Sequence, residues 1–181
     1  MTDNAFDAAG FITVNLDTGC IDSPAQTPMV VVPREVLASL APSDEFLRAA
    51  REWGSRRGEV FAQSVNLAAE SLDLFAQHIQ GEIALMGLGR ASLEVYGDAL
   101  LVNIAVTESA SNVIVEMLVQ FISGYFSAQS DNVFTSTILE NVDSRLQLFV
   151  GSVEAVAEMD AQLQQGVSVS EAIAVLHKEV A

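Results

Sequence analysis

The sequence predicts an α+β fold, in which helices are placed around two β-hairpins. Residues 91–106 alternate apolar and polar side chains on either side of a Gly-Asp pair, which is typical of a hairpin with a two-residue turn. Residues 132–152 repeat the alternation, with a turn at 141–144. Between the two hairpins, residues 109–128 carry apolar side chains at helical spacing, which predicts a long amphipathic helix.

Length and composition are those of one domain with a polar exterior. The chain has 181 residues, and half of them are hydrophobic, which is enough to fill a core without a disulfide or a structural metal. The formal net charge is −16, from 24 acidic and 8 basic residues. Because this charge would repel a phosphate backbone or an anionic membrane, we expect no nucleic-acid partner. We interpret the negative charge either as a surface that keeps the chain soluble or as one that is complementary to a basic partner protein.

Cysteine usage and hydropathy indicate a cytoplasmic protein. Cys20 is the only cysteine, so neither an internal disulfide nor a Cys-pair zinc motif can form within the chain. The first residues lack the pattern of a signal peptide. The most apolar predicted helix, 113–126, contains Glu116 and Gln120 and is too short to span a bilayer, so we expect no stable membrane insertion.

The N-terminal segment differs from the rest of the chain. Residues 1–28 contain two glycines and two prolines with serine and threonine between them. Residues 11–16 alternate weakly and residues 17–19 suit a turn, so the segment forms either a hairpin or a disordered tail. We expect an N-terminal arm over 1–28 and a single domain over 29–181.

The first helices are recognised by their ends. Pro33 suits the first turn of a brief helix, where a missing N–H costs nothing. Ser43 is the predicted N-cap of a long helix over 44–65. A further helix is predicted over 66–86, and the glycines within 87–89 end it.

A stripe of small residues runs along the 44–65 helix. Ala50, Gly54 and Gly58 are four residues apart, and each glycine costs roughly 1 kcal/mol relative to alanine inside a helix. We expect the close approach of another backbone to compensate, and the alternative is that these small residues leave room for a ligand instead of a helix. Trp53 lies beside this stripe as a large packing residue.

The chain closes with two helices after the second hairpin, which pairs residues 132–140 with 145–152. Residues 154–165 are predicted to be helical, and Gly166 ends that helix. Ser168 and Glu171 have the spacing of a capping box, which opens a last helix that ends near residue 180.

No arrangement of catalytic or metal-binding residues is visible. His78 could bind a tetrapyrrole metal axially or transfer protons, but a histidine at the core boundary is the simpler interpretation. His177 is too far from His78 in sequence to suggest a metal site. Adjacent Arg56 and Arg57 are expected on a solvated helix surface. Phosphate-loop, dinucleotide and nucleophile-elbow motifs are absent from the sequence.

This order of elements resembles the 4-vinyl reductase domain family, which shares its fold with the Bet-type subunits of the TRAPP vesicle-tethering complex. The resemblance covers about residues 29–152. It is carried by a Trp-Gly pair and a later glycine in 51–58 (REWGSRRG), by the aromatic and glycine residues of 121–126 (FISGYF), and by Glu140 in the strand that follows.

The resemblance implies an antiparallel sheet of about four strands with helices on one face. It also implies a homodimer that binds a small apolar, aromatic or tetrapyrrole molecule. Sensor members of the family hold zinc through cysteines around the last hairpin. Residues 140–146 contain no cysteine, so we expect no zinc here. Cys20 lies outside the matching region, which also argues against a lipid-acylated cysteine like that of some TRAPP relatives.

Six large side chains are the candidates for a ligand wall between the helices and this sheet. Because protein interiors pack densely, the ordinary interpretation is a filled core. The resemblance supplies the alternative, a cavity that holds an apolar or tetrapyrrole molecule as the only cofactor. The candidates are Trp53, Phe61, Phe75, Met117, Phe121 and Tyr125.

The sequence therefore favours a non-enzymatic, dimeric binding module for a small apolar or tetrapyrrole-like ligand. An assembly or adaptor protein that acts through interfaces with a protein partner, without a small ligand, is the alternative. A reductase ranks third, because no nicotinamide or flavin motif supports it.

Overall fold

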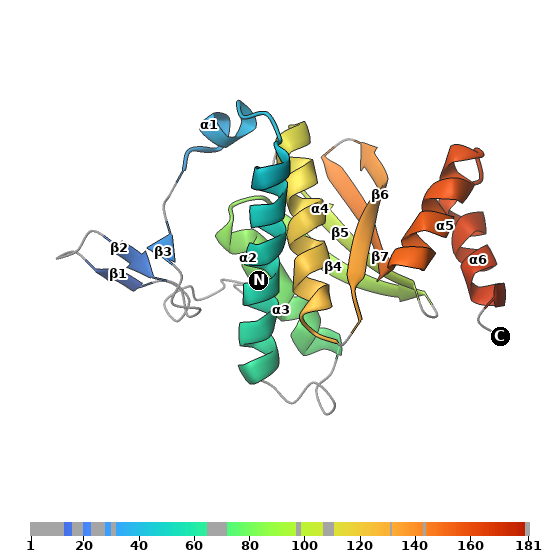
Figure 1. Ribbon diagram of the computed structural model, residues 1–181, viewed down its shortest axis with the longest axis horizontal. Coiled ribbons are helices and arrows are strands. Elements are labelled where there is room, and N and C mark those ends of the chain that lie inside the picture. The colour runs from blue at the N-terminus through green and yellow to red at the C-terminus, as the bar shows by residue number, and fades with distance from the viewer. Residues whose placement is uncertain are drawn as a thin grey trace, which may run out of the picture.

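Figure 1 shows a computed structural model of the chain, which describes a mixed α+β molecule. The described residues are 13–15, 20–22, 28–29, 32–64, 72–96, 99–106, 111–130, 132–142 and 144–179. Six helices are described: α1 (Arg34–Ala38), α2 (Asp44–Ser64), α3 (Leu72–Leu85), α4 (Asn112–Ser127), α5 (Val153–Gln164) and α6 (Val169–Glu179). The predicted turns at 17–19 and 97–98, and the start of the predicted 66–86 helix, lie outside these residues.

The two predicted hairpins join into one sheet, which confirms the predicted fold class. The sheet is antiparallel throughout, with strand order β4-β5-β7-β6. The inner pair brings the hairpins together, for example where Leu100 of β5 pairs with Val150 of β7. The strands are β4 (Arg90–Tyr96), β5 (Ala99–Ala105), β6 (Phe134–Val142) and β7 (Arg145–Ser152).

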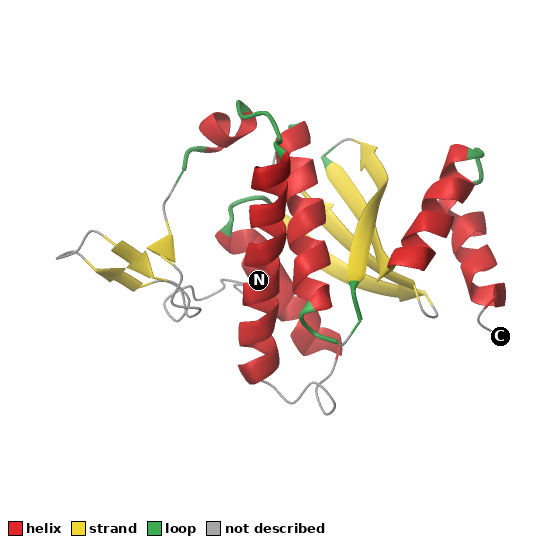
Figure 2. Cartoon of the chain, in the orientation of Figure 1, coloured by secondary structure: helices red, strands yellow, loops and turns green. Residues whose placement is uncertain are grey.

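Helices α2, α3 and α4 cover one face of this sheet (Figure 2). Alternation along β5 directs Val102 and Ile104 toward that face, because successive side chains of a strand point to opposite sides. Helix α4 packs its apolar side against them, and Leu118 and Phe121 are completely buried. The core between these helices and the sheet is the largest in the molecule's described part.

Helices α2 and α4 cross at their glycines. A Cβ placed on Gly54 would clash with the backbone carbonyl of Phe121, and one placed on Gly124 would clash with the carbonyl of Arg51. The two backbones are close enough for the Ser55 hydroxyl to donate to the carbonyl of Gly124, at 3.3 Å. The close backbone approach predicted from the small-residue stripe is therefore confirmed. The alternative of room for a ligand is wrong at Gly54 and Gly58, because the backbone of α4 fills that space.

Helices α5 and α6 lie against the opposite face of the sheet (Figure 1). They cover Ala99, Leu101 and Phe149 with Val156 and Met159. This differs from the expectation of helices on one face only. The physical reason is that β5 begins with apolar residues on both of its sides, so both faces need a cover.

The helix ends follow the predicted capping residues. The amide of Phe46 donates to the Ser43 hydroxyl at 3.2 Å, as expected of the N-cap of α2. The amide of Ser168 donates to the Glu171 carboxylate at 3.2 Å, and the amide of Glu171 donates to the Ser168 hydroxyl at 3.4 Å, so the capping box forms. Helix α4 starts at Asn112, a few residues later than predicted.

The N-terminal segment contains three short strands that form a second antiparallel sheet. The strands are β1 (Thr13–Asn15), β2 (Cys20–Asp22) and β3 (Pro28–Met29). Strand β1 falls within the weakly alternating residues 11–16, and its pairing with β2 is the hairpin interpretation. Strand β3 crosses the predicted boundary between residues 28 and 29, so that domain boundary stays a prediction.

Candidate functional site

Aromatic rings from three helices meet in the core between α2, α3 and α4. Phe61 of α2 lies against His78 of α3, with ring centroids 4.2 Å apart. Tyr125 of α4 stacks near Phe61 at 6.4 Å and meets Phe75 edge-on at 5.7 Å. Phe126 lies 5.2 Å from Phe75 and closes the group. Edge-on and offset contacts of this kind add to the stability that burial alone provides.

All six predicted ligand-wall residues belong to this core. Phe121 links the ring group to Trp53, at 4.9 Å between centroids, and to Tyr125, at 6.2 Å. Met117 is buried in the same core. Trp53 and Phe75 are only partly buried, so this edge of the core reaches the molecular surface. The structure thus brings the six residues together, and their role as a ligand wall stays a prediction.

A buried ion pair lies beside the rings. Nε of Arg57 donates to one carboxylate oxygen of Glu82 at 2.9 Å, and Nη2 donates to the other at 2.6 Å. Both residues are almost fully buried, at 3% and 2% exposure. The prediction that Arg57 lies on a solvated helix surface is wrong, and only its neighbour Arg56 is exposed. Arg57 is three residues after Gly54, on the side of α2 that faces the core.

His78 connects the ion pair to the rings. The hydroxyl of Tyr125 lies 2.7 Å from Nδ1 of His78, and Nε2 of His78 lies 3.7 Å from the Glu82 carboxylate. The histidine lies at the core boundary, as predicted, with its side chain 16% exposed. The nearby carboxylate favours a hydrogen on Nε2, so we assign Tyr125 as the donor to Nδ1.

Burial controls the ionisation of His78 and Tyr125. Desolvation lowers the pKa of His78, and the Arg57 charge lowers it further, although the Glu82 charge acts in the opposite direction. Burial raises the pKa of Tyr125 far above its ordinary value, with Glu82 adding to the effect. Both rings are therefore neutral near pH 7, which suits an interior that excludes water.

One strong donor in this core is unused. Nη1 of Arg57 is buried and has no hydrogen-bond partner among the described residues. A buried donor without an acceptor is costly, and buried polar groups normally find a partner. Nη1 of Arg57 is therefore a donor beside the aromatic rings that lacks an acceptor in the described part of this structure.

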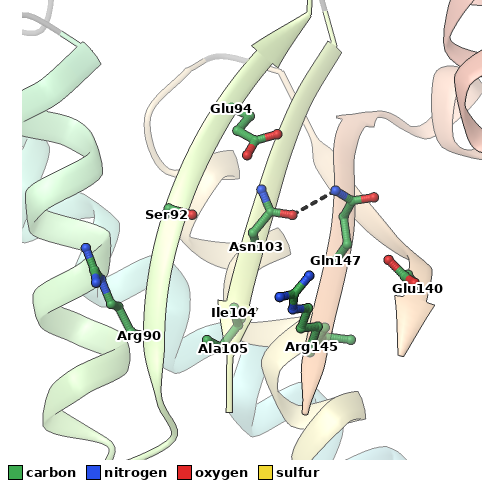
Figure 3. Close-up of a pocket in the computed structure, with 10 residues that line it drawn as sticks. Arg90, Ser92, Glu94, Asn103, Ile104, Ala105, Glu140, Arg145 and Gln147 are labelled. Atoms are coloured by element: carbon green, nitrogen blue, oxygen red, sulfur yellow. Dashed lines mark hydrogen bonds between the residues drawn. The ribbon is translucent and has the colours of Figure 1, made fainter. Parts of the chain in front are cut away.

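A concave region lies on the other side of the sheet from the aromatic core (Figure 3). It is a hollow of about 490 Å³. It lies next to the part of that face that α5 and α6 cover. The residues that line it are Arg90, Ser92, Glu94, Asn103, Ile104, Ala105, Glu140, Arg145, Leu146 and Gln147. The motifs of the sequence do not predict this surface, although polar residues at alternate positions of β4 indicate a solvated strand face.

The described residues contain neither a candidate metal site nor a membrane-spanning helix. They hold no group of three or more histidine, cysteine or acidic side chains that could bind a metal ion. Within the same residues, every helix is too short or too polar to cross a membrane.

No family model matches the chain, and no curated protein is significantly similar to it in sequence. Among solved structures, the phenol-responsive sensory domain of the transcription activator PoxR, crystallised with phenol, aligns with a TM-score of 0.62. The alignment covers 86% of this chain and 92% of that domain at 14% identity. The chain therefore has the fold of that sensory domain.

Proposed function

We propose that the chain is a binding module for a small aromatic or apolar molecule, held between α2, α3 and α4. The observation that carries the proposal is the hydrogen bond between Tyr125 and His78, next to the unused Arg57 donor, inside a group of aromatic rings. A site of this kind combines apolar walls with a few oriented polar groups, as ligand pockets generally do. The shared fold with a phenol-responsive sensory domain supports it.

The polar groups define which ligands fit best. A flat ring can pack against Phe61 and Phe75, and a hydroxyl or carbonyl on that ring can accept from Nη1 of Arg57. A phenolic molecule satisfies both requirements, and a tetrapyrrole-like molecule is a larger candidate of the same apolar class. Trp53 and Phe75 mark the partly exposed edge through which a ligand would enter.

We further propose that binding occurs without catalysis and that the chain is a member of the 4-vinyl reductase domain family. The histidine and the carboxylate beside the rings already have partners within the core: Glu82 with Arg57 and His78 with Tyr125. The order of elements supports membership of the family. A vinyl-reductase assay with a reductant and a vinyl tetrapyrrole tests the enzymatic alternative, and turnover would contradict the proposal.

Phenol titration tests the binding proposal. Trp53 is the only tryptophan and lies 4.9 Å from Phe121, so its fluorescence reports on this core. We expect saturable quenching by phenol and a weaker affinity in Tyr125→Phe. Thr137→Val is the control, because it also removes a hydroxyl that forms a hydrogen bond, to Asp160 at 2.6 Å, and it lies outside the aromatic core. Absence of saturable binding by phenol and 2-naphthol, with no apolar molecule in native mass spectra, would contradict the proposal.

A role in assembly is the second candidate, and one surface favours it. Val36 of α1 is 51% exposed, and Val32 and Leu40, which flank this short helix, are each 48% exposed. Exposed apolar residues close together in the chain are typical of a contact surface, and we propose a homodimer or a protein partner there. Light scattering of the purified chain and of Val36→Asp tests the dimer. A monomeric wild-type chain would contradict it.

A further inference from the structure

The face of the sheet that α5 and α6 partly cover, here called the outer face, is polar at one end and apolar at the other. In the register of the sheet, Ala105 pairs with Arg90 on one side and with Arg145 on the other. The next row on this face contains Ser92, Asn103 and Gln147. Neighbouring rows lie two positions apart along each strand, because alternate side chains share a face. Four positions along a strand span about 13 Å. Arginine, amide and apolar residues therefore follow one another along the face.

The two arginines of the first row make no ion pair with any described residue. Elsewhere, Arg48 and Arg57 are paired with carboxylates, and Arg51 donates to the carbonyl of Phe134 at 2.8 Å. The unpaired guanidinium groups provide the donors that recognise a carboxylate in two-point contact.

Between the arginines and the apolar end lies a pair of amides. Nε2 of Gln147 donates to Oδ1 of Asn103 at 2.7 Å. In Figure 3 the Arg145 side chain extends toward this pair, and Arg90 lies at the β4 edge. This hydrogen bond orients both side chains, and Nδ2 of Asn103, which it does not use, is a further donor in the hollow.

The polar hollow continues into a more apolar one. A second hollow of about 490 Å³ is lined by Tyr96, Leu101, Gln147, Val169, Ser170 and Ile173. Gln147 lines both hollows, so they adjoin. Leu101 lies four residues along β5 from Ala105, about 13 Å away. An elongated molecule can thus contact the arginines at one end and α6 at the other.

We propose that this face binds an amphipathic organic acid with a single carboxylate. The carboxylate binds Arg145 and is supported by Arg90 at the rim. The apolar body extends past Gln147 toward Leu101 and Ile173. Glu94 and Glu140 also line the polar hollow, and their charges disfavour a second acidic group on the ligand. This site lies on the opposite side of the sheet from the aromatic core.

Titration with octanoate tests the proposal, with butyrate and 1-octanol as probes that lack the chain length or the charge. We expect saturable octanoate binding by calorimetry and shifted side-chain amide resonances of Asn103 and Gln147. Affinity falls at least tenfold in Arg145→Gln and less in Arg90→Gln. Arg56→Gln is the matched control, because Arg56 is an exposed arginine of α2 that lies outside both hollows.

Three results would overturn the proposal. One is absence of saturable octanoate binding. Another is octanoate binding that 1-octanol matches or that Arg145→Gln leaves unchanged. The third is octanoate binding that is lost in Tyr125→Phe, because this would place the molecule in the aromatic core. Phenol binding at the core is measured separately, so failure at one site is distinguishable from failure at the other.

Discussion

Arg57 and Glu82 form a two-point ion pair in the core, although they lie on different helices and 25 residues apart in the chain. The pair fixes α3 against α2 at the position where the aromatic rings meet. A buried pair satisfies its own charges but does not by itself stabilise a fold, since both groups lose their hydration. Its value here is that it orients Glu82 toward His78.

Removing one partner of this pair leaves a buried charge. We expect Arg57→Met to lower the free energy of unfolding by about 3–5 kcal/mol, and the double variant Arg57→Met, Glu82→Leu to recover most of that loss. Urea unfolding measures both. The control is Arg48→Met, since the Arg48–Glu52 pair is exposed and should contribute less than about 1 kcal/mol. Equal losses in the two single variants would contradict the burial of Arg57.

The glycine crossing of α2 and α4 tolerates no added methyl group. Gly54→Ala forces the two helices apart, so we expect a loss of about 3 kcal/mol of unfolding free energy. Gly166→Ala is the comparison, because it meets open space and suffers only from a φ of +81°, at a cost of about 1–2 kcal/mol. Thermal unfolding distinguishes them. A Gly54→Ala chain as stable as the Gly166→Ala chain would contradict the close crossing.

Local patterns predicted most of the fold. The alternation of β4 and β5 and the amphipathic pattern of α4 each depend on neighbours in the sequence, so they are visible without a structure. The glycine spacing even indicated a close helix contact. The cover of both sheet faces was missed, although β5 carries apolar residues on both sides. The expectation of helices on one face came from the resemblance, and the apolar pattern was the better guide.

The site was harder to predict because its polar residues come from separate helices. Arg57 is next to an exposed arginine, and Glu82 is one of many acids, so composition favours solvated surfaces for both. Only the helical position relative to Gly54 and Phe61 distinguishes Arg57 from Arg56. The outer-face arginines become neighbours through strand register, which sequence reasoning did not establish beyond the two hairpins.

The stability of the chain should depend on the ionisation of His78. Burial holds the pKa of His78 in the folded chain below 6.5, and the unfolded chain takes up that proton first as the pH falls. The stabilising contribution of neutral His78 is therefore complete above that value. It declines as the pH drops below 6.5 and levels off once the folded histidine also protonates.

His78→Gln should remove this part of the pH dependence. Among the described residues, Tyr125, Glu82 and Arg57 are the titratable or charged groups that face the ring, and they are unchanged in the variant. Urea unfolding between pH 7 and pH 5 measures the difference in slope. Tyr125→Phe keeps the ring buried and should keep the slope. A His78→Gln chain with the wild-type slope would show that other groups cause it.

Phe61 is the residue whose removal tests the ring cluster as a ligand site. Phe61→Ala deletes a buried ring that contacts Phe75, His78 and Tyr125, at a cost of about 3–5 kcal/mol. The cavity left behind is lined by aromatic side chains, and apolar cavities of that kind bind benzene. We expect benzene to raise the melting temperature of Phe61→Ala more than that of the wild type.

The control is Phe46→Ala, whose ring is only partly buried near the start of α2. A Phe61→Ala chain that benzene stabilises no more than Phe46→Ala would show that the cluster collapses, and would argue against a ligand site between the three helices.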